Sequence, residues 1–162
     1  MIGWASVPYD PKWAYDHPRS SAQMSAAGPA ANLILVLISV LFIRLGVSAG
    51  VFVPPDSVSF THVIEAASGG SLNTVALLLD VFFSLNLLLL VFNLLPIPPL
   101  DGSGIVPLFL KRTHAQKYIE AVHSGAISFI GIVVAWNLFD YVYEPLHLSM
   151  VNLLFYGIAQ YG

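Results

Sequence analysis

Long apolar runs separated by short polar stretches dominate this sequence. Two runs, at about residues 29–47 and 72–95, each come close to or exceed the roughly 20 residues that a membrane-spanning helix needs. Two more follow at about residues 125–142 and 146–158, and the last is short enough to be re-entrant or interfacial. The pattern predicts an all-α polytopic membrane protein with about three to four transmembrane or re-entrant helices.

The composition supports a membrane-embedded chain. Of the 162 residues, 57% are hydrophobic and 9% are charged, whereas a soluble domain carries about 25% charged residues. We expect one domain over residues 1–162, with an interfacial lead-in at 1–27, core helices at 28–100 and C-terminal helices at 101–162. The net charge of -3 is too small to indicate nucleic acid as a partner. The lack of cysteine excludes disulfides, thiolate metal ligands and a cysteine nucleophile.

The polar stretches are expected to lie at the membrane surfaces. Residues 1–27 carry Trp4 and Trp13, and tryptophan is enriched at headgroup level. They are compatible with a disordered lead-in or with a short extended segment, which could pair with an unwound peptide by strand addition. Residues 48–71 are predicted to form a loop with a short interfacial helix near residues 60–67.

Basic residues predict which side each stretch faces. Lys12 and Arg19 precede the first apolar run, and Lys111, Arg112 and Lys117 follow the second, but the loop between the runs has neither lysine nor arginine. By the positive-inside rule, both basic stretches are cytoplasmic and the loop faces the other side. Arg44, near the far end of the first run, is expected to snorkel to the interface.

A proline-rich stretch ends the second apolar run. It reads Asn-Leu-Leu-Pro-Ile-Pro-Pro-Leu-Asp-Gly at residues 93–102, here called the proline–aspartate motif. Pro96, Pro98 and Pro99 should unwind the helix, and unwound backbone at membrane depth survives only against protein or a water-filled cavity. An ionisable residue there is a functional-site candidate, so Asp101 is expected to point into a polar interior. Alternatively, Asp101 caps a short helix that starts near Ile105.

The first apolar run also contains notable residues. Gly28 is small enough to allow close helix contact, and Pro29 fits a first helical turn. Asn32 lies inside the run, where an interhelical hydrogen bond would account for it.

Other polar residues have simpler interpretations. Asp80, near the outer end of the second run, is expected to be solvated or interfacial. Asn86 and Asn93 are seven residues apart and share a helix face. His114 and His123 fit no local ligand spacing and are expected at the surface.

Three stretches resemble the site-2 protease family of intramembrane zinc metalloproteases. The proline–aspartate motif resembles the second signature of that family, and Ala-Ala-Gly-Pro-Ala-Ala-Asn at residues 26–32 resembles its G-P-x-x-N helix entry. Residues 3–11 are similar to the extended segment that precedes that entry, so the resemblance covers about residues 3–110.

The resemblance implies roles for individual residues. It makes Asp101 the third zinc ligand and gives Gly102 a backbone position that requires close approach or a positive φ. Asn93 would orient the substrate or assist with oxyanion charge. Gly28, Asn32, Pro96 and Pro98 would pack the active site or line the substrate path.

One family feature is missing from the sequence. The H-E-x-x-H signature, which provides two zinc ligands and the general base, is absent, and no two of the five histidines are four residues apart. The expected explanation is an N-terminally truncated chain, the C-terminal portion of a protease, that is inactive alone and uses zinc only in the complete protein.

The leading hypothesis is therefore an intramembrane zinc metalloendopeptidase. Its partners would be the lipid bilayer and membrane-spanning proteins or signal-peptide remnants as substrates, with the site near the cytoplasmic side of a bacterial-type cytoplasmic membrane. A non-catalytic relative that binds membrane helices is the first alternative. The second alternative is a small transporter subunit with Asp80, Asn86 and Asn93 along a polar path.

Overall fold

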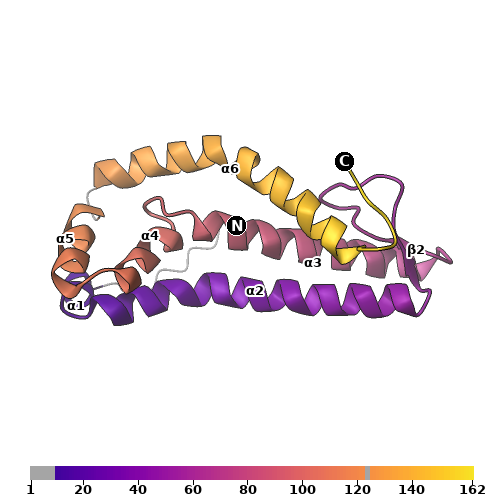
Figure 1. Ribbon diagram of the computed structural model, residues 1–162, viewed down its shortest axis with the longest axis horizontal. Coiled ribbons are helices and arrows are strands. Elements are labelled where there is room, and N and C mark those ends of the chain that lie inside the picture. Colours follow the sequence, from indigo (N-terminus) through magenta and orange to yellow (C-terminus); the bar gives the residue numbers. More distant parts are fainter. Residues whose placement is uncertain (1–9, 123–124) are drawn as a thin grey trace, which may run out of the picture.

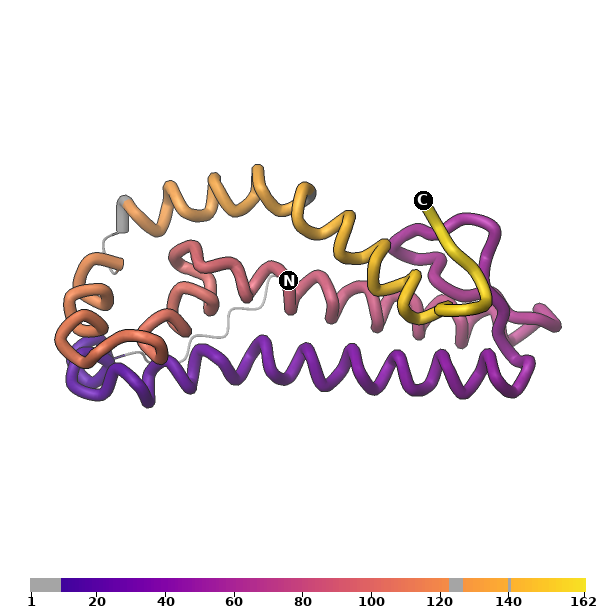
Figure 2. Tube along the Cα trace, viewed as in Figure 1, coloured from indigo at the N-terminus to yellow at the C-terminus, as the bar shows by residue number. Residues whose placement is uncertain are grey.

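A computed structural model describes residues 10–122 and 125–162 of the chain. Two long helices, α2 (Pro18–Ser48) and α3 (Ser71–Leu94), run antiparallel along the molecule (Figure 1). A third, α6 (Gly125–Leu154), packs against α3, and the tube trace shows it bending as it approaches the far end of the molecule (Figure 2). The predominance of long helices confirms the predicted all-α class.

The α2 helix begins much earlier than the apolar pattern predicts. Its 31 residues extend for about 46 Å, and Pro29 lies inside it rather than in its first turn. Alanines on both sides of Pro29 favour the helix, and neighbouring helices make an interior proline tolerable in membrane proteins.

A short helix, α1 (Pro11–Asp16), precedes α2, and the Asp10 carboxylate accepts a hydrogen bond from the Lys12 N–H at 2.9 Å. An extended lead-in is therefore wrong for the helical residues 11–16 and 18–27. Residues 3–9 of the expected extended segment lie outside the described residues.

The loop between α2 and α3 contains two paired strands instead of the expected helix. Strands β1 (Phe52–Val53) and β2 (Glu65–Ala66) are antiparallel. The loop folds against α3, where Asp80 is only 2% exposed and accepts a hydrogen bond from the Ile64 N–H at 3.0 Å. The expectation of a solvated Asp80 is wrong, because its carboxylate binds loop backbone that would otherwise lack a partner.

The proline break occurs where the sequence predicts it. The α3 helix ends at Leu94, and the chain turns through residues 95–100, which include a cis peptide between Pro98 and Pro99. Two short helices follow, α4 (Asp101–Ile105) and the 3-10 helix η1 (Val106–Phe109). The amphipathic helix α5 (Arg112–Val122) then leads back beside α1.

The C-terminal region departs from prediction in one respect. The two expected apolar segments are a single helix, α6, with Pro145 in its interior. The Arg44 guanidinium donates to the Leu154 carbonyl at 2.7 Å, because the last carbonyls of a helix lack intrahelical partners. The snorkelling of Arg44 to the interface stays a prediction.

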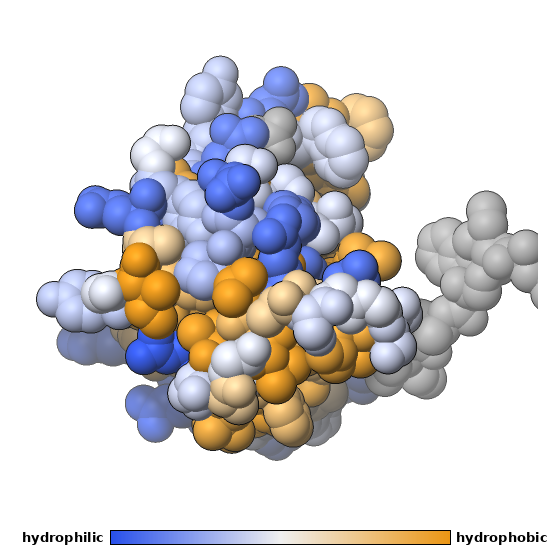
Figure 3. Space-filling model, turned by 90° about the vertical axis from the view of Figure 1, so that its right-hand side faces the viewer, coloured by the Kyte–Doolittle hydropathy of each residue, from blue (hydrophilic) through white to orange (hydrophobic). Residues whose placement is uncertain are grey.

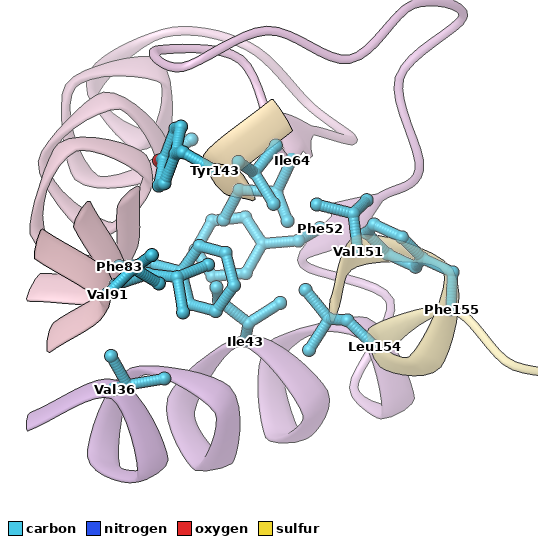
Figure 4. Close-up of a cluster of buried hydrophobic side chains, with 13 residues drawn as sticks. Val36, Ile43, Phe52, Ile64, Phe83, Val91, Tyr143, Val151, Leu154 and Phe155 are labelled. Carbon is cyan, nitrogen blue, oxygen red and sulfur yellow. The ribbon is translucent and has the colours of Figure 1, made fainter. Parts of the chain in front are cut away.

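An apolar core joins α2, α3, the loop and α6. Phe83 and Ile43 point toward the loop and the end of α6 in this core (Figure 4). Outside the core, α2 exposes a continuous apolar surface, with the exposed residues Leu33, Ile34, Leu37, Ile38, Leu41, Phe42 and Leu45.

Helices α2 and α3 are long and apolar enough to cross a membrane, and a third span results if Arg112–Val122 and Ile127–Phe139 count as one. The length and apolar character of these helices make the chain an integral membrane protein. The end view of the loop shows hydrophilic side chains gathered above hydrophobic ones (Figure 3).

Candidate active site around Asp101

Asp101 is the first residue of α4 and does not cap a helix. The capping position is Leu100, and no side chain there bonds to the helix backbone. The alternative of a capping aspartate before a helix near Ile105 is therefore wrong. The carboxylate of Asp101 makes none of the hydrogen bonds found among the described residues, so it remains available to a ligand.

Gly28 of α2 faces the Asp101 carboxylate. A Cβ atom built on Gly28 would lie 3.0 Å from Oδ2 of Asp101, closer than ordinary van der Waals contact. Gly28 shares one face of α2 with Ser21, Ser25 and Asn32, because these residues follow the helical period. The role of Gly28 in the structure is thus to leave space for a carboxylate.

Asp101 lines a partly polar cavity of about 340 Å³. Its other lining residues come from α2, the proline turn, α4, η1, α5 and α6: Ser21, Ser25, Pro99, Ser103, Gly104, Pro107, Tyr118, Ile119, Val122 and Ser128. Desolvation in this setting raises the pKa of the Asp101 carboxyl above its usual value. A cation beside the carboxylate would favour its charged form.

The small residues after Asp101 allow the backbone to pack tightly. A Cβ on Gly102 would overlap the carbonyl oxygens of Leu94 and Leu95 at the end of α3. A Cβ on Gly104 would overlap the Ser25 side chain of α2. Gly102 has a negative φ, so close approach rather than a left-handed conformation accounts for this glycine.

The other predicted site residues lie apart from this cavity. Asn32 and Asn93 are half-buried, and neither side chain makes a hydrogen bond with the residues that the structure describes. Pro98 is half-buried and Pro96 is exposed, and none of these four lines the cavity. Asn86 is buried and donates to the Phe82 carbonyl of its own helix at 2.7 Å. The roles of Asn32, Asn93, Pro96 and Pro98 stay predictions.

The serines were missed by sequence reasoning, although a signal for them existed. Ser21 and Ser25 precede Gly28 at helical spacing, but residues 1–27 were not expected to be helical. Ser103 was hidden because its role depends on how α4 packs against α2.

The described residues do not form a zinc site by themselves. No group of three histidine, cysteine, aspartate or glutamate side chains in residues 10–122 and 125–162 could hold a metal ion. The described histidines are dispersed: His17 and His114 are exposed, His62 pairs with Glu65 at 2.9 Å, and His147 lies 3.2 Å from the Ser84 hydroxyl. His114 confirms its expected surface position, and the side chain of His123 lies outside the described residues.

Comparison with known proteins identifies the family. Residues 5–138 match the sequence profile of the family described as "Peptidase family M50". The chain belongs to peptidase family M50. This M50 chain is 33% identical over 151 residues to the protein named "Putative zinc metalloprotease YwhC" of Bacillus subtilis (strain 168).

That alignment covers 90% of the M50 chain and 60% of the relative, so the chain spans about three-fifths of the relative's length. No solved structure matches the M50 chain. The family membership confirms the resemblance drawn from the proline–aspartate motif and residues 26–32.

Proposed function

We propose that this M50 chain serves an intramembrane zinc endopeptidase activity, with Asp101 as one protein ligand of the zinc. The main observation behind this proposal is that the Asp101 carboxylate, the one carboxylate of the proline–aspartate motif, lies unpaired against Gly28 and lines a cavity. Family membership and the name of the Bacillus subtilis relative, "Putative zinc metalloprotease YwhC", support the assignment.

The residues of the cavity have defined tasks in this proposal. A bound zinc would supply an activated water and a Lewis acid. Gly28 lets the carboxylate approach α2, and Gly102 fixes the start of α4 against the end of α3. Ser21, Ser25 and Ser103 provide hydroxyls that can hold water or substrate backbone near Asp101.

The described residues provide too few zinc ligands to hold a catalytic zinc ion by themselves. A catalytic zinc takes three protein ligands and keeps one open position, and the described residues provide one. We expect the polypeptide of these 162 residues by itself to bind zinc weakly and to leave membrane substrates uncleaved.

The length of α2 and the positions of the basic residues support a site at the cytoplasmic side of the membrane. Gly28 lies about 30 Å along α2 from Ser48, which matches the thickness of about 30 Å of a bilayer hydrocarbon core. If Ser48 is at one boundary, Gly28 and Asp101 are at the other. The basic residues around α1 and α5 lie at the Asp101 end, opposite the loop (Figure 1), and positive charge marks the cytoplasmic side. Substrates entering there would be membrane-spanning segments or signal-peptide remnants.

A non-catalytic relative that binds membrane helices is the second candidate. The observation in its favour is that the described residues contain no three-ligand cluster. A transporter subunit has less support, because Asp80 and Asn86 are occupied by the loop backbone and by their own helix.

The test uses the protein as its own cells make it. The intact mass, the bound zinc and the cleavage of a single-span reporter are measured for the wild type, Asp101→Asn and Asp56→Asn. Asp56 is an exposed loop residue and provides the same chemical change away from the cavity. We expect Asp101→Asn to lower cleavage at least 100-fold and to lose zinc, with Asp56→Asn unchanged. A wild type without zinc or cleavage that still retains a membrane-helix partner would refute the protease in favour of the binding relative.

A further inference from the structure

A second cavity, of about 400 Å³, lies at the basic end of the molecule. It forms where the start of α2 meets the junction between η1 and α5, and is lined by Asp16, His17, Pro18, Arg19, Ser20, Pro107, Leu110, Arg112 and Ala115. It shares only Pro107 with the Asp101 cavity. This basic cavity is therefore a separate feature.

Two arginines contribute unpaired positive charge to the basic cavity. Within the described part of the chain, neither Arg19 nor Arg112 has a carboxylate within ion-pair distance. Arg112 uses one nitrogen to donate to the Asp16 backbone carbonyl at 3.3 Å, which fixes its position and leaves most of its fork of donors free. Asp16 is the one carboxylate residue in the lining, so the two arginines exceed it by one charge.

The position of the basic cavity indicates the kind of anion that can reach it. Since α2 extends about 46 Å and a hydrocarbon core measures about 30 Å, roughly 16 Å of α2 must lie outside the core. With Ser48 at the opposite boundary, this outer part is the start of α2, which contains Arg19. Arg112 lines the same cavity as Arg19 and therefore lies at the same level. Phosphate groups are the abundant anions at that level of a membrane.

We propose that the basic cavity binds a phosphate group, held by the guanidinium groups of Arg19 and Arg112. Guanidinium forks match phosphate oxygens in pairs, and the two arginines come from segments that only the folded chain brings together. An anionic phospholipid headgroup and a soluble phosphate compound share this chemistry. The proposal is independent of the peptidase assignment, because it uses neither Asp101 nor zinc.

Ser20 offers a test that keeps both arginines in place. It is exposed, lines the basic cavity and lies in the first turn of α2, where a glutamate favours the helix through its dipole. Ser20→Glu should therefore fold normally while its carboxylate repels phosphate and occupies the arginines. Ser20→Gln adds nearly the same volume without charge and is the matched control.

Binding is measured on the full chain in detergent micelles by native mass spectrometry with phosphatidylglycerol, and separately by competition with inorganic phosphate. We expect Ser20→Glu and the double variant Arg19→Gln/Arg112→Gln each to lower lipid retention at least tenfold. Ser20→Gln and Lys12→Gln/Lys117→Gln should change it less than twofold, although the latter removes as much charge from the same end.

The outcomes separate the sources and the alternatives. Retained phosphatidylglycerol that millimolar phosphate does not displace identifies a lipid headgroup, and displacement by phosphate identifies a soluble phosphate compound; both support a phosphate site. Equal losses for the lysine and arginine double variants would show a diffuse charge effect and overturn the proposal. Unchanged binding of both ligands by Ser20→Glu would also overturn it.

Discussion

Replacing Gly28 by alanine should disturb the Asp101 carboxylate without unfolding the chain. The added Cβ would lie 3.0 Å from Oδ2, whereas ordinary contact begins at 3.4 Å, so the oxygen must retreat by about 0.4 Å. Ligand distances at metal sites hold to within about 0.2 Å. The required shift is twice that tolerance, so we expect zinc affinity and cleavage to fall by about 10-fold to 100-fold, as for other changes that misplace a ligand.

The stability of the Gly28→Ala variant should move little. Alanine is favoured over glycine in a helix by up to about 1 kcal/mol, and the displaced carboxylate is the end of a flexible side chain. The free energy of unfolding should thus stay within about 1 kcal/mol of wild type.

Gly46→Ala on the same helix is the matched control for this experiment. Its Cβ would overlap the Phe52 ring, far from Asp101 along α2, so it should lower stability and leave the zinc affinity of the folded protein unchanged. The assays are chelator competition for zinc, reporter cleavage and thermal unfolding of the protein isolated from its own cells. Full zinc affinity and cleavage in a folded Gly28→Ala protein would refute the role given to this contact.

Three further changes test the fold. Asp80→Ala should cost about 1–3 kcal/mol and speed amide exchange at Ile64, because that buried N–H loses its acceptor; unchanged exchange would contradict the contact. Gly102→Ala should cost about 1–3 kcal/mol, since its Cβ meets the backbone carbonyl of Leu94, and an unaltered melting temperature would show that α4 can shift freely. Phe83→Ala should lower the free energy of unfolding by about 3 kcal/mol, near the lower end for such changes because lipid is as apolar as the core. The melting temperature should fall by roughly 6–12 °C.

Part of this protein follows from local sequence properties alone. The apolar runs determine α3 and most of α2, because a bilayer selects helices of about 20 residues regardless of their neighbours. Pro96 and its neighbours determine where α3 ends, since proline removes a donor and clashes with the preceding turn. The family followed from the same stretch, because the motif is contiguous in the sequence.

Local rules failed where packing decided the outcome. Pro29 did not begin its helix and Pro145 did not separate two helices, because neighbouring elements can satisfy the groups that a proline leaves free. Asp80 near a helix end suggested solvent exposure, but the loop that buries it is set by contacts between distant segments.

Only the tertiary structure could place the polar groups of the two cavities. Gly28 meets Asp101 because α4 returns to α2 after the proline turn, and Arg19 and Arg112 line one cavity because α5 returns to the start of α2. Hydrophobic periodicity and proline geometry act within a few residues, so they specify the elements. The pairing of distant polar groups depends on which surfaces pack, and only the folded chain determines that.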